Sequence, residues 1–231
     1  MTDEETPAPT VFDPLTPEQV RVLGCLMEKE VTTPDSYPLT LNALVNACNQ
    51  ATNRDPVVAY AEVTVQEALE VLKSRLFVYQ LTMAGARVQK FRHNVPAKFP
   101  SLEAPETALL CTLLLRGAQT SGELRQRTER LHNFPDLASV EATMQKLISP
   151  ANEMPLAVML PPGSGRKSAV YMHTLCGEPV APAPGGMIIV EAAPLPPSQR
   201  EEDRLWREKV ERELADLRAE LQSLKEKLGE A

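Results

Sequence analysis

The feature that most constrains the fold of this 231-residue chain is one order of segments that occurs twice. In each copy, three stretches with apolar residues at helical spacing precede two short β-rich stretches that are joined by a turn. The first copy occupies residues 15–98 and the second residues 102–176. Each copy has its own apolar stripes, so the pattern predicts two small domains of one kind rather than a single large domain.

Cap residues and an internal alignment support the repeat. Residues 16–19, 64–67 and 120–123 each begin with Thr and end with Glu or Gln, which is the spacing of a helix capping box. A shift of 87 residues places Thr33 on Thr120, and a slightly smaller shift places His93 on His173. Identity between the copies is low, so the order of elements carries the argument.

Three helices closed by a β-hairpin form the winged-helix version of the helix-turn-helix fold. In that fold the third helix commonly lies in the major groove of DNA, and the hairpin, or wing, contacts the backbone or the minor groove. We therefore predict a mainly α protein with small β-hairpin wings, of the α+β class, that contains two tandem winged-helix domains.

The segments outside the two copies have compositions of their own. Residues 1–14 are acidic and proline-rich and predict a disordered tail, while residues 177–199 form a linker with six prolines. Residues 200–229 predict a coiled-coil helix through a heptad stripe at Val210, Leu214, Leu217, Leu221, Leu224 and Leu228. Self-association into a homo-oligomer is the expected use of this stripe, and folding back onto the two domains is the alternative.

The charge of the chain is distributed unevenly. The whole chain has 24 basic and 31 acidic residues, yet residues 15–100 hold 9 basic and 8 acidic residues and residues 101–176 hold 7 of each. The neutral domains are compatible with a local basic face, which DNA binding requires. No apolar run reaches the roughly 20 residues of a membrane span, and the acidic start lacks a signal-peptide core, so we expect a cytoplasmic protein that contacts no membrane.

Motifs for catalysis, metals and cofactors are missing from the sequence. It contains no GxGxxG, GxxxxGK[ST] or GxSxG segment and no local set of nucleophile, base and orienting group. Its four cysteines are scattered, without the spacing of a zinc site or a disulfide framework. We therefore expect a non-enzymatic protein that uses no cofactor.

The wings hold the best candidates for contact with double-stranded DNA. Arg87, Lys90 and Arg92 have no acidic residue nearby in the first wing, and Arg166 and Lys167 repeat the pattern in the second. Alternate residues of a strand share a face, so Lys90 and Arg92 are expected to project together toward phosphates. The alternative is that these residues only keep an exposed hairpin edge soluble.

The third helices argue against direct reading of bases. The first offers Glu62, Glu67 and Glu70, and the second offers Glu141 and Gln145. Base readout favours Arg, Asn and Gln, with acids useful mainly at cytosine. The leading hypothesis is therefore a DNA-binding or regulatory protein whose wings contact phosphates, and the alternative is a protein–protein adaptor built from tandem winged helices.

Two further polar groups are weaker candidates. The run that ends at Asn53 and Arg54 has the residue types to reach base edges or phosphates, although capping and turn formation account for it better. In the second domain, Arg125, Arg127 and Arg130 lie partly on one side of a helix. Glu123 and Glu129 are placed to pair with these arginines, which favours a solvated face.

Several longer segments carry a resemblance to a known family. They include Leu23 to Glu28, Tyr37-Pro38-Leu39, the run Asn53-Arg54-Asp55-Pro56, the run Arg116-Gly117-Ala118-Gln119-Thr120, and Tyr171-Met172-His173. These segments are similar to the YceH-like family of uncharacterised bacterial proteins over residues 15–176. The resemblance implies the tandem winged-helix architecture and implies no activity.

Overall fold

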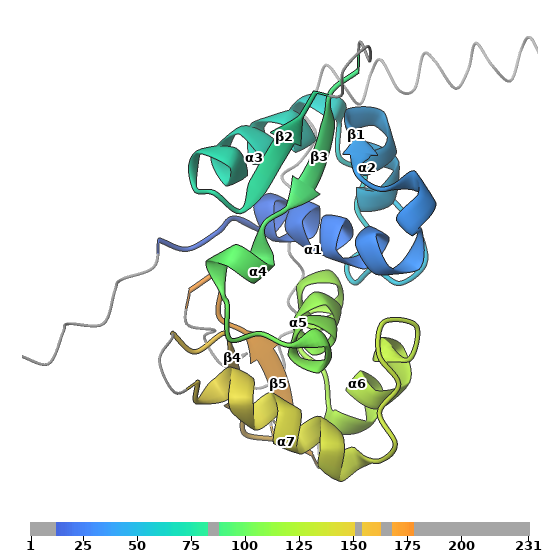
Figure 1. Cartoon of the computed structure of the whole chain (residues 1–231). Helices are drawn as coiled ribbons and strands as arrows, with labels where there is room; N and C mark the ends of the chain where they lie inside the picture. The colour runs from blue at the N-terminus through green and yellow to red at the C-terminus, as the bar shows by residue number, and fades with distance from the viewer. Residues whose placement is uncertain (1–12, 83–87, 151–153, 163–167, 178–231) are drawn as a thin grey trace, which may run out of the picture. The chain divides into compact units, whose positions relative to one another are not determined.

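The computed structural model describes residues 13–82, 88–150, 154–162 and 168–177, all within one structural unit. Over these ranges the chain forms helices and two small antiparallel sheets (Figure 1), which confirms the α+β class. None of the helices in the described part is long and apolar enough to cross a bilayer.

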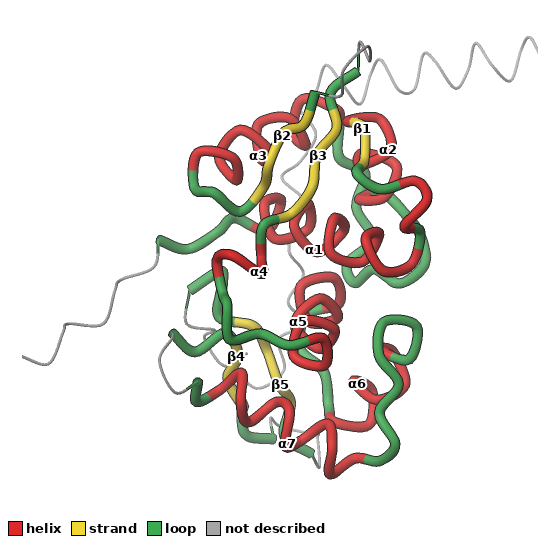
Figure 2. Tube along the Cα trace, in the orientation of Figure 1, coloured by secondary structure: helices red, strands yellow, loops and turns green. Residues whose placement is uncertain are grey.

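The same order of elements occurs in both halves of the unit. The first half contains α1 (Pro17–Thr32), a 3₁₀ turn (Pro34–Ser36), β1 (Leu39–Thr40), α2 (Leu41–Cys48), α3 (Glu62–Ser74), β2 (Val78–Leu81), β3 (Lys90–His93) and the short helix α4 (Val95–Lys98). The second half contains α5 (Ala104–Arg116), α6 (Ser121–Thr128), α7 (Leu137–Ile148), β4 (Ala157–Leu160) and β5 (Val170–His173). Figure 2 shows the strands gathered in one group in each half.

The returning strands β3 and β5 of the two sheets correspond to each other. The first has the strand order β1-β3-β2, with Leu39 opposite Phe91. The second pairs β4 with β5, and Gln119 forms an isolated bridge to Tyr171. Since both pairs are related by the same shift of 80 residues, Gln119 takes the position of β1, and the predicted match of the strand-terminal histidines holds.

Two details of the predicted repeat are wrong. Helix α3 begins at Glu62 after Ala61, which makes no side-chain cap bond, so the capping box predicted at residues 64–67 does not form. Thr33 is the C-terminal cap of α1, whereas Thr120 caps the start of α6. The true counterpart of Thr120 is Thr40, which caps the start of α2. Because α1 is longer than α5 and is followed by a 3₁₀ turn, the shift between the copies changes from 87 residues in the first helices to 80 residues at the second helices. The capping boxes at Thr16 and Thr120 are confirmed.

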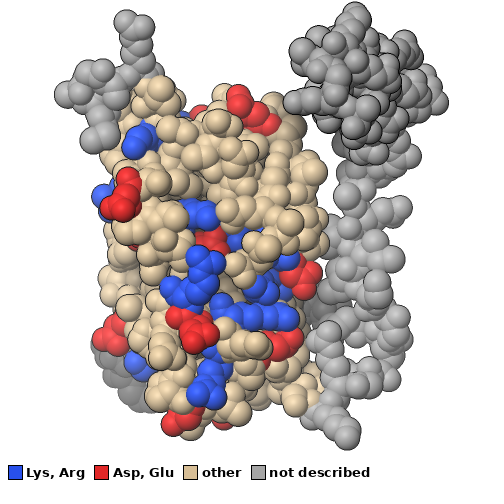
Figure 3. Space-filling view, turned by 90° about the vertical axis from the view of Figure 1, so that its right-hand side faces the viewer, with Lys and Arg blue, Asp and Glu red and all other residues tan. Residues whose placement is uncertain are grey.

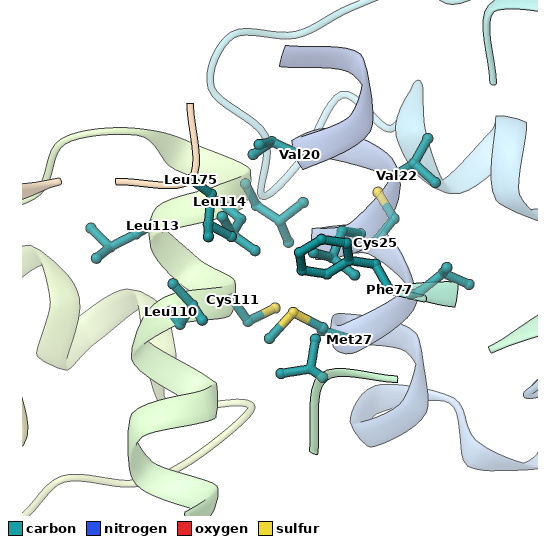
Figure 4. Close-up of a cluster of buried hydrophobic side chains, with 14 of the residues drawn as sticks. Val20, Val22, Cys25, Met27, Phe77, Leu110, Cys111, Leu113, Leu114 and Leu175 are labelled. Carbon is teal, nitrogen blue, oxygen red and sulfur yellow. The ribbon is translucent and has the colours of Figure 1, made fainter. Parts of the chain in front are cut away.

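The core runs through both halves because α1 packs against α5 (Figure 4). Residues 19–28 of α1 are all buried, which is the pattern of a helix surrounded by protein. Gly24 lies at the contact, where an added Cβ would stand 2.9 Å from Leu115 Cδ2, and the Cys111 thiol donates to the Gly24 carbonyl over 3.4 Å. Figure 4 shows Cys111 and Met27 pointing toward each other across this contact.

Candidate nucleic-acid interface

The β2–β3 hairpin presents one polar outer face. Its register places Tyr79 opposite Arg92 and Leu81 opposite Lys90. On the opposite face Val78, Phe91 and His93 are buried and Gln80 is exposed; Phe91 is 6% exposed, whereas Tyr79 is 41% exposed. Lys90 and Arg92 therefore lie on the same face, beside an exposed aromatic ring. We call Tyr79, Leu81, Lys90 and Arg92 the hairpin face.

The two cations of the hairpin face are unpaired within the described residues. Neither Lys90 nor Arg92 makes an ion pair or a side-chain hydrogen bond to another side chain there. Their positive charge is thus available to an external anion. The other predicted wing cations, Arg87, Arg166 and Lys167, lie outside the described residues.

A buried histidine anchors the hairpin to α1. The His93 backbone N–H donates to the Tyr37 hydroxyl over 2.8 Å, and Nε2 lies 2.7 Å from the Glu30 carboxylate. Burial lowers the pKa of His93, while the charge and hydrogen bond of Glu30 oppose that change. The inward side of the strand therefore fixes the position of the hairpin, and its outward side remains open for contact.

The third helix of the first half has an acidic surface. Glu62, Glu67 and Glu70 are exposed on α3. Lys73, the only basic residue of the helix, lies 2.9 Å from Glu70 and donates to Gln80. A helix with this surface repels a phosphate backbone, so α3 is a poor reading helix.

Arg54 is a buried structural residue, which corrects its assignment as a surface contact. The residue is 5% exposed, and its guanidinium donates to both Glu28 carboxylate oxygens over 3.2 and 2.6 Å. Its Nε and Nη2 also donate to the Ala47 carbonyl. Burial acts to lower the pKa of Arg54, but the pKa is raised overall, with the hydrogen bond and charge of Glu28 among the opposing causes.

Asn53 ties the first half to the end of α5. Its backbone has a positive φ of 59°, a conformation that Asn tolerates, and its Oδ1 accepts a hydrogen bond from Arg116. A backbone hydrogen bond strengthens this connection: the Asp55 N–H donates to the Leu115 carbonyl over 3.0 Å. In the same loop, the Asn49 amide exchanges two hydrogen bonds with the Tyr60 backbone, so it serves turn formation.

Sequence reasoning missed a hollow at the C-terminal ends of α1 and α5. Three arginines line this hollow, and we call it the arginine hollow; its polar lining consists of Glu28, Thr32, Asn53, Thr112, Arg116, Arg127 and Arg130. Figure 3 shows Lys and Arg side chains gathered across the middle and lower part of one face, with acidic side chains among them. Only Arg127 and Arg130 have a local sequence signal, as part of the predicted arginine face, because the other residues of the hollow come from segments that meet only in the folded chain.

The predicted pairing of the α6 arginines with acids is only partly observed. Arg127 Nη2 lies 3.4 Å from the Glu123 carboxylate, and Arg127 also donates to Gln119. Arg125 instead donates to two backbone carbonyls of the connection to α7. Arg130 makes no ion pair or hydrogen bond to a described side chain.

Positive charges crowd together in the arginine hollow. Partial burial lowers the pKa of Arg116, and the nearby cations Arg127 and Arg54 lower it further. Asp55 and Glu28 act in the opposite direction. Like charges held this close are costly unless an anion or solvent compensates them.

Comparison with known proteins identifies the family of this α+β protein. Residues 15–166 match the family described as "Protein of unknown function, DUF480". The chain is 53% identical over 161 residues to a UPF0502 protein of Geotalea uraniireducens, which covers 70% of this chain and 72% of that protein. It is 42% identical over 219 residues to the UPF0502 protein YceH of Salmonella paratyphi B, which covers 94% and 98%.

A UPF0502 protein of Vibrio vulnificus is 43% identical over 219 residues, which covers 94% of each chain. The chain therefore belongs to the DUF480, or UPF0502, family, as its resemblance to the YceH-like proteins predicts.

The predicted oligomerisation stripe from Val210 to Leu228 lies outside the described residues, as do the acidic tail up to residue 12 and the linker from residue 178 onward.

Proposed function

We propose that this protein is a non-enzymatic DNA-binding regulator built from two tandem winged-helix domains, residues 15–98 and 102–176. The order of three helices and a hairpin in each half supports the domain assignment. The three-stranded order β1-β3-β2 supports it further, because the first strand lies beside the returning strand of the hairpin.

The observation that carries the proposal is the hairpin face. Lys90 and Arg92 project from the same side of β3, without an acidic partner among the described residues, next to the exposed ring of Tyr79. Such a surface supplies two phosphate contacts from strand backbone that the sheet holds in place, so only the side chains lose freedom on binding.

The proposed contact is made by the wing and not by the third helix. The glutamates on α3 would lie against DNA phosphates in the usual helix-first geometry, which is unfavourable. Binding through the hairpin alone supplies few base contacts, so we expect modest affinity with weak sequence preference and a clear salt dependence.

The test compares the wild-type chain with a variant carrying Arg87→Ala, Lys90→Ala and Arg92→Ala by fluorescence anisotropy on mixed-sequence duplex DNA. Measurements at about 50 and 200 mM salt give the salt slope, which is expected to fall by about 0.9 for each lost phosphate contact. As a matched control, Glu67→Gln on α3 should leave binding unchanged or strengthen it. Equally negligible binding by wild type and triple variant at low salt would overturn the proposal.

One observation favours the adaptor as a second candidate. Val63 and Val71 are 58% and 39% exposed on α3, among its glutamates. An apolar strip bordered by acids suits a protein partner with a complementary basic rim. Binding of this kind depends weakly on salt, so the same titration separates it from DNA binding.

The proposal includes a homo-oligomer held by a coiled coil of residues 200–229. Two copies would double the number of hairpin faces on one DNA and raise the avidity. Sedimentation of the full chain at tens of micromolar tests this part. A monomeric wild type contradicts it, and a wild-type oligomer that becomes a folded monomer with Leu217→Glu and Leu221→Glu supports it.

A further inference from the structure

We infer that the arginine hollow binds a phosphate group through Arg116, Arg127 and Arg130. The site is built from the C-terminal end of α5, from α6 and its following turn, and from Asn53 in the first half. The site shares no residue with the hairpin face, so the inference does not depend on DNA contact by the wing.

Charge is the first argument. The one carboxylate that lines the hollow, Glu28, is already bound by both terminal nitrogens of Arg54. Arg127 shares its charge with Glu123 at 3.4 Å, whereas Arg130 has no acidic partner among the described residues. The hollow therefore keeps an excess of positive charge, which a phosphate would neutralise.

The second argument is that two of the guanidinium groups are held in place. Arg116 donates to Asn53 Oδ1, and Arg127 donates to Gln119 Oε1. Gln119 is 2% exposed, and its amide donates to the Arg116 carbonyl over 3.1 Å and the Ala118 carbonyl over 2.8 Å. A guanidinium that is already oriented loses little freedom when it binds, and its fork matches two phosphate oxygens.

The helix ends at the hollow do not prevent anion binding. Carbonyls at a helix C-terminus carry partial negative charge, which would repel a phosphate. Here the Leu115 carbonyl accepts from the Asp55 N–H, the Arg116 carbonyl accepts from Gln119, and the Lys29 carbonyl accepts from the Thr33 N–H. These three carbonyls already accept hydrogen bonds, so the arginines are not required to cap them.

The phosphate can come from two sources that share this chemistry: a phosphodiester of the DNA backbone or the phosphate of a small free molecule. Both present negatively charged oxygens that Arg recognises in the same way. Binding to duplex DNA and binding to inorganic phosphate are therefore measured side by side.

The probe for the site is inorganic phosphate, titrated into the full chain by calorimetry, with chloride at the same ionic strength as the reference anion. Arg130→Ala removes an arginine that has no structural partner in the described chain, so the fold should persist. Loss of one charge-assisted contact is expected to weaken phosphate affinity about tenfold. Arg116→Lys keeps the charge but loses the fork and should also weaken binding, while Arg92→Ala, on the hairpin face, should leave it unchanged.

The outcomes separate the site, its source and the proposed function. No phosphate binding by wild type at millimolar concentrations, or equal binding by wild type, Arg130→Ala and Arg116→Lys, overturns the inference. If phosphate binding is lost in Arg130→Ala and the salt slope for DNA also falls by about one, the ligand is the DNA backbone. Loss of phosphate binding with unchanged or absent DNA binding assigns the site to a small phosphorylated molecule, and absent DNA binding by wild type then counts against the hairpin proposal alone.

Discussion

The first helices of the two halves carry different residues at the same buried position. Glu28 in α1 and Leu115 in α5 stand at the same place in the repeat, 87 residues apart, and both are buried, at 7% and 3% exposure. In the first half the connection from α2 to α3 supplies Arg54, which compensates the buried carboxylate. The shorter connection of the second half contains Arg130, which is exposed, and supplies no buried arginine, and an apolar residue occupies this position. The comparison shows that a buried charge in this fold depends on a loop and not on the helix that carries it.

The largest expected effect comes from breaking that ion pair. Arg54→Ala leaves the buried Glu28 without its hydrogen-bonded cation, with Lys29 3.9 Å away and Arg116 also near, and should cost about 3–5 kcal/mol of the free energy of unfolding. The double variant Glu28→Leu, Arg54→Met imitates the second half and should lie close to the wild type, because apolar replacement of a buried pair is often neutral. Urea unfolding measures both variants. A double variant as unstable as Arg54→Ala would show that the charges themselves are required.

The strand-terminal histidines give a second contrast with an effect that depends on pH. His93 is paired with Glu30, whereas His173 Nδ1 has no hydrogen-bond partner among the described residues. Burial lowers the pKa of His173 from 6.5 to about 4. The unfolded chain therefore binds this proton first as the pH falls, so the stabilising contribution is complete above pH 6.5 and is lost progressively between pH 6.5 and 4.

The expected loss from His173 is roughly 3 kcal/mol at pH 4, from about 1.4 kcal/mol for each unit of pKa. Urea midpoints for the wild type should fall across this interval. The variant His173→Leu should remove most of that fall, even where its stability at neutral pH differs. An unchanged pH dependence in His173→Leu would mean that other groups cause it, and His93→Leu is the matched control, with a smaller expected change because Glu30 offsets burial.

Much of this fold is predictable because its signals are local. The apolar spacing in the six long helices, the capping boxes at Thr16 and Thr120, and the match of His93 with His173 all follow from neighbouring residues. The short helix α4 is missing from the sequence prediction, and β1 is predicted only as a short extended piece before the second helix, since segments this short carry no periodicity. Pro96 lies in the first turn of α4, where a proline is tolerated.

The candidate sites also differ in whether a local sequence signal predicts them. The shared face of Lys90 and Arg92 follows from strand alternation. The burial of Arg54 depends on its loop folding back onto α1 and α2, and the meeting of Asn53 with Arg116 depends on the packing of α1 against α5; no local pattern reveals either. Residues that look like surface contacts in a polar loop can therefore become part of the interior once a second helix is placed.

The smallest expected effect comes from the starts of the third helices. Asp136 caps α7 through a capping box with Ser139, whereas Ala61 at the start of α3 makes no side-chain bond. The backbone of Ala61 is extended, with φ −69° and ψ 158°, which is the geometry that a capping Ser or Thr adopts. Ala61→Ser should therefore stabilise the protein by about 0.5–1 kcal/mol, because its hydroxyl can accept from an otherwise unbonded N–H of the first turn.

Thermal and urea unfolding of Ala61→Ser measure this gain, with Ala61→Val as the control that changes size without adding an acceptor. Asp136→Ala provides the matched loss in the second half and should lower stability. If Ala61→Ser is no more stable than the wild type, the first turn of α3 is already satisfied by solvent, and the difference between the two helix starts has no energetic consequence. A gain in stability for Ala61→Ser but not for Ala61→Val would instead show that the start of α3 has a backbone geometry that accepts a side-chain cap, as the start of α7 does.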